Sequence, residues 1–143
     1  MPKLIISNKF IKSNYEIDST YECGISLLGW EVKSLRAKNA KLDNSFCSIS
    51  NNLELWINNL NIAQYMQVKG DLKRSRKLLM HKSEILKLKN NQEKFSFVIV
   101  PASIYWSNNH IKVEIALAKA LKKYDKRAKE RENEIKKQIK SSY

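Results

Sequence analysis

Few side chains in this sequence have the types and spacing that catalysis requires. Its two histidines, His81 and His110, lie far apart in the chain, and His110 follows a predicted turn. Paired histidines with a lysine can perform the acid–base steps of RNA cleavage, but no nucleophile motif or positioned carboxylate accompanies them. The H-E-x-x-H zinc motif, the phosphate-binding loop and G-x-G-x-x-G are all missing. We therefore predict no enzymatic activity, with a small histidine-dependent RNA nuclease as the alternative class.

The two cysteines, Cys23 and Cys47, form neither a disulfide framework nor a C-x-x-C metal motif. Both lie in apolar, strand-like stretches, so we expect buried, reduced thiols in a cytoplasmic protein. We predict no metal and no cofactor. The first residues, M-P-K-L-I-I-S-N-K, lack the apolar region of a signal peptide, and no run approaches the length of a membrane span.

Binding chemistry is better represented, because the chain is strongly basic. Lysine and arginine number 27 against 14 aspartates and glutamates, which gives a net charge of +13 and a pI near 9.8. Such a field concentrates polyanions, so RNA, DNA or an anionic membrane is the expected class of partner. Two clusters of cations are suited to neutralising phosphates: Lys33, Arg36, Lys38 and Lys41, and then Lys69, Lys73, Arg74, Arg76 and Lys77.

Aromatic side chains and one carboxylate extend this binding chemistry. Five aromatic residues near the basic clusters are candidates for stacking on bases, and the same residues are also consistent with core positions: Tyr15, Tyr21, Trp30, Tyr65 and Trp106. Glu22 lies on the polar side of its predicted strand, where it is either a solvated surface carboxylate or an acceptor for RNA donors. The residues alone predict a generic nucleic-acid platform.

The elements that must position these residues are mostly strands. The stretch 15–28 alternates apolar and polar residues and predicts a half-buried strand, which Gly29 ends. W-E-V-K-S-L-R-A-K changes to a helical period and predicts a short helix with Glu31 near its positive end. Asn51-Asn52 and Asn108-Asn109 predict hairpin turns between short strands, and N-L-N-I-A-Q-Y predicts a further strand.

The remaining segments complete a mainly β prediction. The N-terminal tip is expected to be irregular, 66–77 a basic loop, and the stretch after His81 a helix with Ser83 as its N-cap and asparagines at its end. F-S-F-V-I-V-P and A-S-I-Y-W predict two strands, and H-I-K-V-E-I-A-L a third. About six short strands with hairpin turns and two small helices predict a compact antiparallel β-barrel.

The composition changes near Lys119, so we predict a barrel domain over 1–118 and a basic C-terminal tail over 119–143. The tail contains mostly good helix formers, yet it has too few apolar residues to form a docking stripe. Repulsion among its lysines predicts a tail that is largely unfolded when free.

Several segments, in the same order along the chain, closely resemble the family of SsrA-binding proteins, also called small protein B. The similarity runs from about Asn8 into the tail and is carried by Y-E-C-G-I-S-L-L-G-W-E-V-K-S-L-R-A-K-N-A-K-L-D-N-S-F, R-S-R-K-L-L-M-H-K-S-E-I, and I-K-V-E-I-A-L-A-K with K-K-Y-D-K-R. The resemblance implies an antiparallel β-barrel related to the oligonucleotide-binding fold, with small helices at its ends. This agrees with the barrel predicted from periodicity.

The resemblance also implies a function. The family's members bind the tRNA-like domain of transfer-messenger RNA (tmRNA, or SsrA RNA) and, with elongation factor Tu, accompany it to stalled bacterial ribosomes in trans-translation. The tail is expected to enter the decoding centre and empty mRNA channel of the small subunit, where rRNA phosphates would permit it to form a helix. The implied partners are tmRNA and the ribosome, with no membrane partner. A general single-stranded or ribosomal RNA-binding barrel is the alternative.

Carried over position by position, the resemblance implies particular contact residues. Glu22, Leu79 and His81 match positions of the family's RNA-binding surface, and Arg74, Arg76 and Lys77 match its basic R-x-R-K. The candidate RNA-binding set is Lys9, Glu22, Lys33, Arg36, Lys41, Arg74, Arg76, Lys77, Leu79 and His81. The candidate ribosome-contacting residues of the tail are Lys122, Lys123, Tyr124, Asp125, Lys126 and Arg127.

The junction of barrel and tail departs from the family pattern. Ala120 and Leu121 stand where a glycine and a lysine are usual. Alanine favours a continuous helix where glycine permits a bend, and Leu121 offers an apolar side chain that can pack on the barrel edge.

Overall fold

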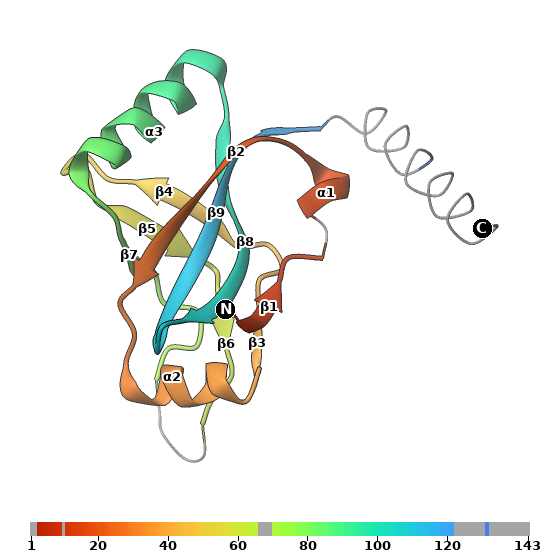
Figure 1. Ribbon diagram of the computed structural model, residues 1–143, viewed down its shortest axis with the longest axis vertical. Coiled ribbons are helices and arrows are strands. Elements are labelled where there is room, and N and C mark those ends of the chain that lie inside the picture. Colours follow the sequence, from red (N-terminus) through yellow and green to blue (C-terminus); the bar gives the residue numbers. More distant parts are fainter. Residues whose placement is uncertain (1–2, 10, 66–69, 122–130, 132–143) are drawn as a thin grey trace.

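The computed structural model describes residues 3–9, 11–65, 70–121 and 131 (Figure 1). Within these ranges the helices are α1 (Ile11–Asn14), α2 (Gly29–Arg36) and α3 (Lys82–Phe95). The strands are β1 (Lys3–Ser7), β2 (Tyr15–Ile25), β3 (Ala40–Lys41), β4 (Phe46–Ile49), β5 (Leu55–Asn58), β6 (Asn61–Ile62), β7 (Arg76–Leu79), β8 (Val98–Ser107) and β9 (His110–Ala120).

Six of these strands form a closed antiparallel ring. The hydrogen-bonded order is β8-β4-β5-β7-β2-β9, and a further β8–β9 pairing closes it, while β1 is added outside the ring on β8. Strands β3 and β6 form a separate two-stranded sheet. Figure 1 shows α2 and α3 at opposite ends of the barrel. The predicted mainly β barrel of about six strands is confirmed.

A tight hairpin turn closes the ring. Asn108 and Asn109 both have positive φ, 50° and 66°, and Ser107 pairs directly with His110 across the turn. Asparagine tolerates the left-handed region better than most residues, and two consecutive residues with positive φ match the twist of a two-residue hairpin. This predicted turn is confirmed and fixes the register of β8 against β9.

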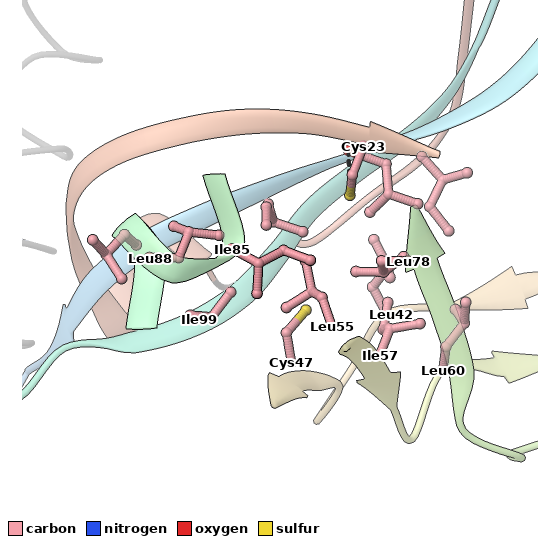
Figure 2. Packing of buried hydrophobic residues seen from close by; sticks show 14 of the residues in the cluster. Cys23, Leu42, Cys47, Leu55, Ile57, Leu60, Leu78, Ile85, Leu88 and Ile99 are labelled. Carbon is pink, nitrogen blue, oxygen red and sulfur yellow. Dashed lines mark hydrogen bonds between the residues drawn. The ribbon is translucent and has the colours of Figure 1, made fainter. Parts of the chain in front are cut away.

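The barrel interior is filled by alternating apolar side chains. Figure 2 shows members of this cluster reaching inward from the strands and from α3, where Ile85 and Leu88 are buried. Cys23 and Cys47 belong to the same cluster as free, buried thiols, as predicted. Burial raises the pKa of the Cys23 thiol to about 12 and raises the pKa of Cys47 well above its usual value. Both thiols therefore remain protonated and unreactive near neutral pH.

Several element predictions were wrong in detail. No element was predicted near the N-terminus, but Lys3–Ser7 form β1, which pairs with β8, and α1 follows at Ile11–Asn14; the first two residues lie outside the described ranges. Helix α3 begins after His81 rather than Ser83 and continues past the asparagines to Phe95, where Ser96 takes the left-handed cap conformation. The Asn51-Asn52 turn is present, but the left-handed residue is Leu53, with φ 57°, as in a three-residue hairpin loop.

Strand boundaries also differ around Pro101 and Arg76. Pro101 does not separate two strands, because it lies inside β8 at a register shift between Pro101 and Ser103, where a missing N–H is tolerated. The predicted loop over 66–77 overlaps β7, which begins at Arg76 and pairs with β5 and β2. This strand gives Arg76 and Lys77 opposite directions, because side chains alternate along a strand.

Candidate RNA interface

Glu22 is held on the outer surface of the barrel by a side chain from another strand. The register of β2 against β9 places Glu22 opposite Glu114, and β8 pairs Tyr105 with Lys112 on the adjoining strand. The Tyr105 hydroxyl donates a hydrogen bond to Glu22 Oε2. Burial, this hydrogen bond and the negative charge of Glu22 raise the pKa of Tyr105. Tyr105 therefore stays a neutral donor that orients an exposed carboxylate.

Glu22 lines a surface pocket of about 430 Å³, here called the Glu22 pocket. Its walls also include Leu79 and His81, at the end of β7 and the start of α3, together with Glu84 and Lys112. Leu79 is 51% exposed and presents an apolar side chain to this pocket. The three RNA-binding positions implied by the resemblance are thus brought together from separate parts of the chain.

A second pocket of about 350 Å³ adjoins the first, and it is here called the Arg36 pocket. The two pockets share Gly24, Leu79 and Lys112. Arg36, from α2, lies over the indole of Trp106 with its guanidinium carbon 5.3 Å from the ring centroid. A continuous surface therefore runs from the start of α3, across β7, β2 and β9, to α2.

Gly24 sets the spacing between the two pockets. It pairs with Leu79 between β2 and β7. A Cβ atom added at Gly24 would lie 3.3 Å from the Leu79 Cβ, which is tighter than ordinary packing. A larger residue at this position would push Leu79 outward and alter the wall that both pockets share.

The other exposed cations surround this surface unevenly. Lys33 is one helical turn from Arg36 on α2, and its Nζ lies 5.6 Å from the centroid of the Tyr65 ring. Lys77 points outward on β7, like Leu79, with Nζ 3.9 Å from a Glu54 carboxylate oxygen. The exposed Lys41 lies on β3 beside a separate small pocket, and the exposed Lys9 lines none of these pockets.

Arg76 is not available for the direct phosphate contact that was predicted. Its side chain is 0% exposed, and its Nε donates to Glu31 Oε2 at 2.5 Å. Its remaining nitrogens donate to the backbone carbonyls of Leu60, Arg74 and Leu72. A guanidinium with these partners inside the protein is a structural group, and the expectation of an RNA contact is corrected accordingly.

The same carboxylate also binds Arg74. Arg74 Nη2 lies 2.5 Å from Glu31 Oε1, and the Arg74 side chain retains 30% exposure. Glu31 also accepts a 2.7 Å hydrogen bond from the Leu28 backbone N–H at the start of α2. Burial alone would raise the pKa of Glu31, but the bonds from Arg74, Leu28 and Arg76 hold it below its usual value. The Glu31–Arg74–Arg76 network therefore ties α2 to the segment before β7.

The charge of the Glu22 pocket restricts what it can bind. Glu22 and Glu84 outnumber Lys112, the lysine of this pocket, so hydrogen-bond donors such as base amino groups and ribose 2′-hydroxyls suit it better than phosphates do. Cations on the flanks, including Arg36 and Lys77, suit the phosphates. Among the described residues, no group of three or more histidine, cysteine or acidic side chains is placed to hold a metal ion. The helices in these ranges are too short or too polar to span a bilayer.

Sequence reasoning missed Tyr105, Lys112 and Glu84 as parts of this surface. The alternation of β9 correctly indicates that Lys112 faces away from the core, and the two-residue turn fixes its pairing with Tyr105. The pairing of β2 with β9 joins segments far apart in the chain, and no local pattern indicates it. The tail residues Lys122, Lys123, Tyr124, Asp125, Lys126 and Arg127 lie outside the described residues.

A closed antiparallel barrel with cations around a donor-binding carboxylate is the architecture of a small nucleic-acid-binding barrel protein. The family model described as "SmpB protein" matches residues 5–143. The chain is 48% identical over 141 residues to the SsrA-binding protein of Mycoplasmopsis pulmonis, covering 98% of this chain and 97% of that protein. The chain therefore belongs to the SmpB family of SsrA-binding proteins.

More distant relatives and a solved structure agree with this assignment. Identity is 41% over 139 residues to the SsrA-binding protein of Bifidobacterium longum, covering 95% of this chain and 88% of that protein. A chain from the structure "tmRNA-SmpB: a journey to the center of the bacterial ribosome" superposes with a TM-score of 0.69 at 38% identity. That match covers 82% of this chain and 85% of the other.

Proposed function

We propose that this protein binds SsrA RNA (tmRNA) and acts with it in trans-translation on the ribosome. Membership in the SmpB family, over residues 5–143, is the observation that carries the proposal. The structure supports it with a surface in which Glu22, Leu79 and His81 meet at one pocket beside the start of α3. The family assignment also supports a binding protein over an enzyme.

The charge distribution suggests how the tRNA-like domain of tmRNA is held. Glu22, oriented by Tyr105, accepts hydrogen bonds from base or ribose donors, and Leu79 packs against the exposed nucleotide. Lys33, Arg36 and Lys77 neutralise phosphates around the pocket, with Lys9 and Lys41 adding to the attraction at longer range. Binding then depends on the shape of the RNA and the position of its hydrogen-bond donors as well as on its charge. This favours one particular folded RNA over RNA in general.

The C-terminal tail supplies the second part of the proposed function. In this scheme the barrel holds tmRNA. The tail, which includes Tyr124 and Asp125, enters the decoding centre and the empty mRNA channel of the small subunit. Elongation factor Tu is an indirect partner, because it binds the charged RNA, and the protein acts in the cytoplasm. Strand β9 continues through Ala120, and the Leu121 N–H donates to the Asn14 carbonyl at 3.0 Å. We therefore place the junction after Leu121 rather than at Lys119.

Competition binding tests the proposed RNA specificity. The purified protein is titrated with the labelled tRNA-like domain of tmRNA at about 0.2 M salt, where nonspecific phosphate binding is weak. Unlabelled tmRNA is expected to displace the probe at far lower concentration than an equal length of mixed tRNA. Equal displacement by both RNAs would favour the general RNA-binding barrel instead.

Deletion of 122–143 tests the division of labour between barrel and tail. The shortened protein keeps every described residue of β9, so RNA binding at about 0.2 M salt should be largely retained. Tagging of nascent peptides on stalled ribosomes, measured in a reconstituted translation system, should be abolished. Normal tagging by the shortened protein would contradict the proposed role of the tail.

The nuclease alternative is tested with the histidines. His81 and His110 line different, adjoining pockets rather than one. Any RNA turnover in a purified sample should be unchanged by His81→Ala and His110→Ala. Turnover that either substitution removes would revive the enzymatic interpretation.

A further inference from the structure

We propose that the Arg36 pocket binds one unstacked nucleobase of the bound RNA, which stacks on the Arg36 guanidinium. The RNA concerned is tmRNA if the proposed function holds. Trp106 supports the guanidinium from the opposite side, so that ring, cation and base form a three-layer stack. This assigns Trp106 and the pocket beside it a role in base recognition, separate from the hydrogen bonding at Glu22.

The position of Arg36 carries the first part of the inference. Arg36 is an exposed residue in the last turn of α2, yet its guanidinium lies 5.3 Å from the Trp106 ring centroid. Such a contact stabilises one placement of a side chain that otherwise samples many rotamers. Because a guanidinium is flat, its second face remains available for stacking, and nucleobases commonly stack on arginine planes in single-stranded RNA sites.

The lining of the pocket carries the second part. Ile25, Leu27 and the exposed Leu79 form apolar walls, while Lys112 and His110 add polar groups at the rim. A base has two apolar faces and a polar edge, which suits such a mixture. A phosphate would instead have to lose water against aliphatic carbon, which is costly for a charged group. The volume of about 350 Å³ is at the small end for ligand pockets, the scale of a single planar group.

The connection to the Glu22 pocket carries the third part. Both pockets share Leu79 and Lys112, so an RNA strand that places a donor on Glu22 is within reach of the Arg36 pocket. A strand bound there also brings its phosphates close to the exposed Lys33, one helical turn from Arg36. Neighbouring nucleotides can therefore occupy the two pockets while the phosphates face the flanking lysines.

Comparing Arg36→Lys with Arg36→Ala separates stacking from charge. Affinity for the tRNA-like domain of tmRNA is measured for each variant across several salt concentrations. Arg36→Lys keeps the charge and should leave the slope of log K against log salt unchanged, yet weaken binding about ten-fold because the planar stack is lost. Arg36→Ala should weaken binding further and reduce the slope by about 0.7 to 0.9. Arg36 is exposed, so neither change should impair folding.

Lys94 provides the matched control, because it is exposed and lies over an aromatic ring, with Nζ 5.2 Å from the Phe95 centroid, but lines neither pocket. Lys94→Arg should bind like the wild type. If Arg36→Lys also binds like the wild type, Arg36 contacts a phosphate only and the base-pocket proposal is overturned.

An abasic scan identifies the base directly. Nucleotides of the tRNA-like RNA are replaced one at a time by abasic residues, and each RNA is tested against the wild type and Arg36→Lys. One position should cost the wild type about ten-fold in affinity and cost Arg36→Lys almost nothing, because the stack is already absent there. The proposal is refuted if every abasic RNA weakens the two proteins equally. A wild type that fails to prefer tmRNA over tRNA would instead count against the proposed function, since the Arg36 comparison can be made on either RNA.

Discussion

Glu22 and Glu31 are both carboxylates with hydrogen-bonded partners, but they serve different ends because their surroundings differ. Glu31 is fully buried, and two arginines and a backbone N–H saturate its oxygens. Glu22 is exposed on the barrel surface, and its described partner is the neutral hydroxyl of Tyr105. Glu31 therefore stabilises the fold, whereas the Glu22 carboxylate can still accept hydrogen bonds from a ligand.

The comparison teaches that charge alone does not identify an RNA-binding residue. Arg76 belongs to a strongly basic R-x-R-K run, yet it neutralises Glu31 in the interior. Glu22 carries the wrong sign for phosphate, yet it lies at the centre of the candidate interface. A charged group is therefore free to bind RNA only if it is exposed and its hydrogen-bonding capacity is not already used within the protein.

The largest expected effect is on stability, from breaking the buried network at Glu31. Glu31→Ala leaves Arg76 buried without its counter-charge and should lower the free energy of unfolding by about 3–5 kcal/mol. Urea denaturation measures this. Glu54→Ala is the control, because the Lys77–Glu54 pair is exposed and should contribute less than about 1 kcal/mol. Similar losses of unfolding free energy from the two substitutions would contradict the expectation that the buried carboxylate contributes more than the exposed one.

Arg76→Ala should destabilise the protein without removing a phosphate contact. Glu31 retains Arg74 as a partner, so the loss should fall near the lower end of the buried-pair range, about 3 kcal/mol. At matched salt the folded variant should bind RNA with an unchanged salt slope. A slope reduced by the amount that one phosphate contact contributes would show that Arg76 reaches the RNA, contrary to its burial.

The stability supplied by Glu31 should depend on pH. Its folded-state pKa is lowered, so the unfolded chain binds a proton more readily, and the contribution is fully present above the unfolded pKa. It should be lost as pH falls from near the ordinary value of 4.5 through the lower folded-state pKa. The measurement is the difference in unfolding free energy between wild type and Glu31→Gln, which should shrink on acidification. A difference that stays constant with pH would contradict the lowered pKa.

The smallest expected effect concerns the orientation of Glu22. Tyr105→Phe removes the hydroxyl donor while keeping the ring, and it should weaken RNA binding about two- to five-fold, the scale of one hydrogen bond. Stability should change little, because the bond lies at the surface. In a Glu22→Ala background the same substitution should have no further effect on affinity. An equal loss in both backgrounds would mean that Tyr105 acts independently of Glu22.

Local patterns predicted much of the barrel because hairpins are local structures. The alternation in H-I-K-V-E-I-A-L and the Asn108-Asn109 turn correctly gave β9 and its pairing with β8. The helix α2, which begins at Gly29, followed from the change to a helical period. The resemblance to the family indicated Glu22, Leu79 and His81, which the structure brings together at one pocket.

The burial of Arg76 had a signal in the sequence that the loop assignment hid. In β7 the residues alternate, so Arg76 and Leu78 point inward while Lys77 and Leu79 point outward. Once R-K-L-L is recognised as a strand, the inward position of Leu78 places Arg76 inside as well. The identity of its partner was not predictable in this way, because Glu31 is 45 residues away. Local periodicity therefore predicts that the Arg76 side chain points inward, but the contact with Glu31 depends on long-range packing.

Strand β9 also fixes a length. It is hydrogen-bonded to β2 on one side and β8 on the other, and its register holds Glu114 opposite Glu22 and Ala120 opposite Tyr15. Ala120 is six residues beyond Glu114 along this extended strand, a span of roughly 20 Å at about 3.3 Å per residue. Both edges are bonded as far as Ala118, and Lys119 and Ala120 remain paired with β2, so this segment cannot shorten without breaking strand pairing. The pairing of β9 therefore fixes the distance between the Glu22 surface and the start of the tail.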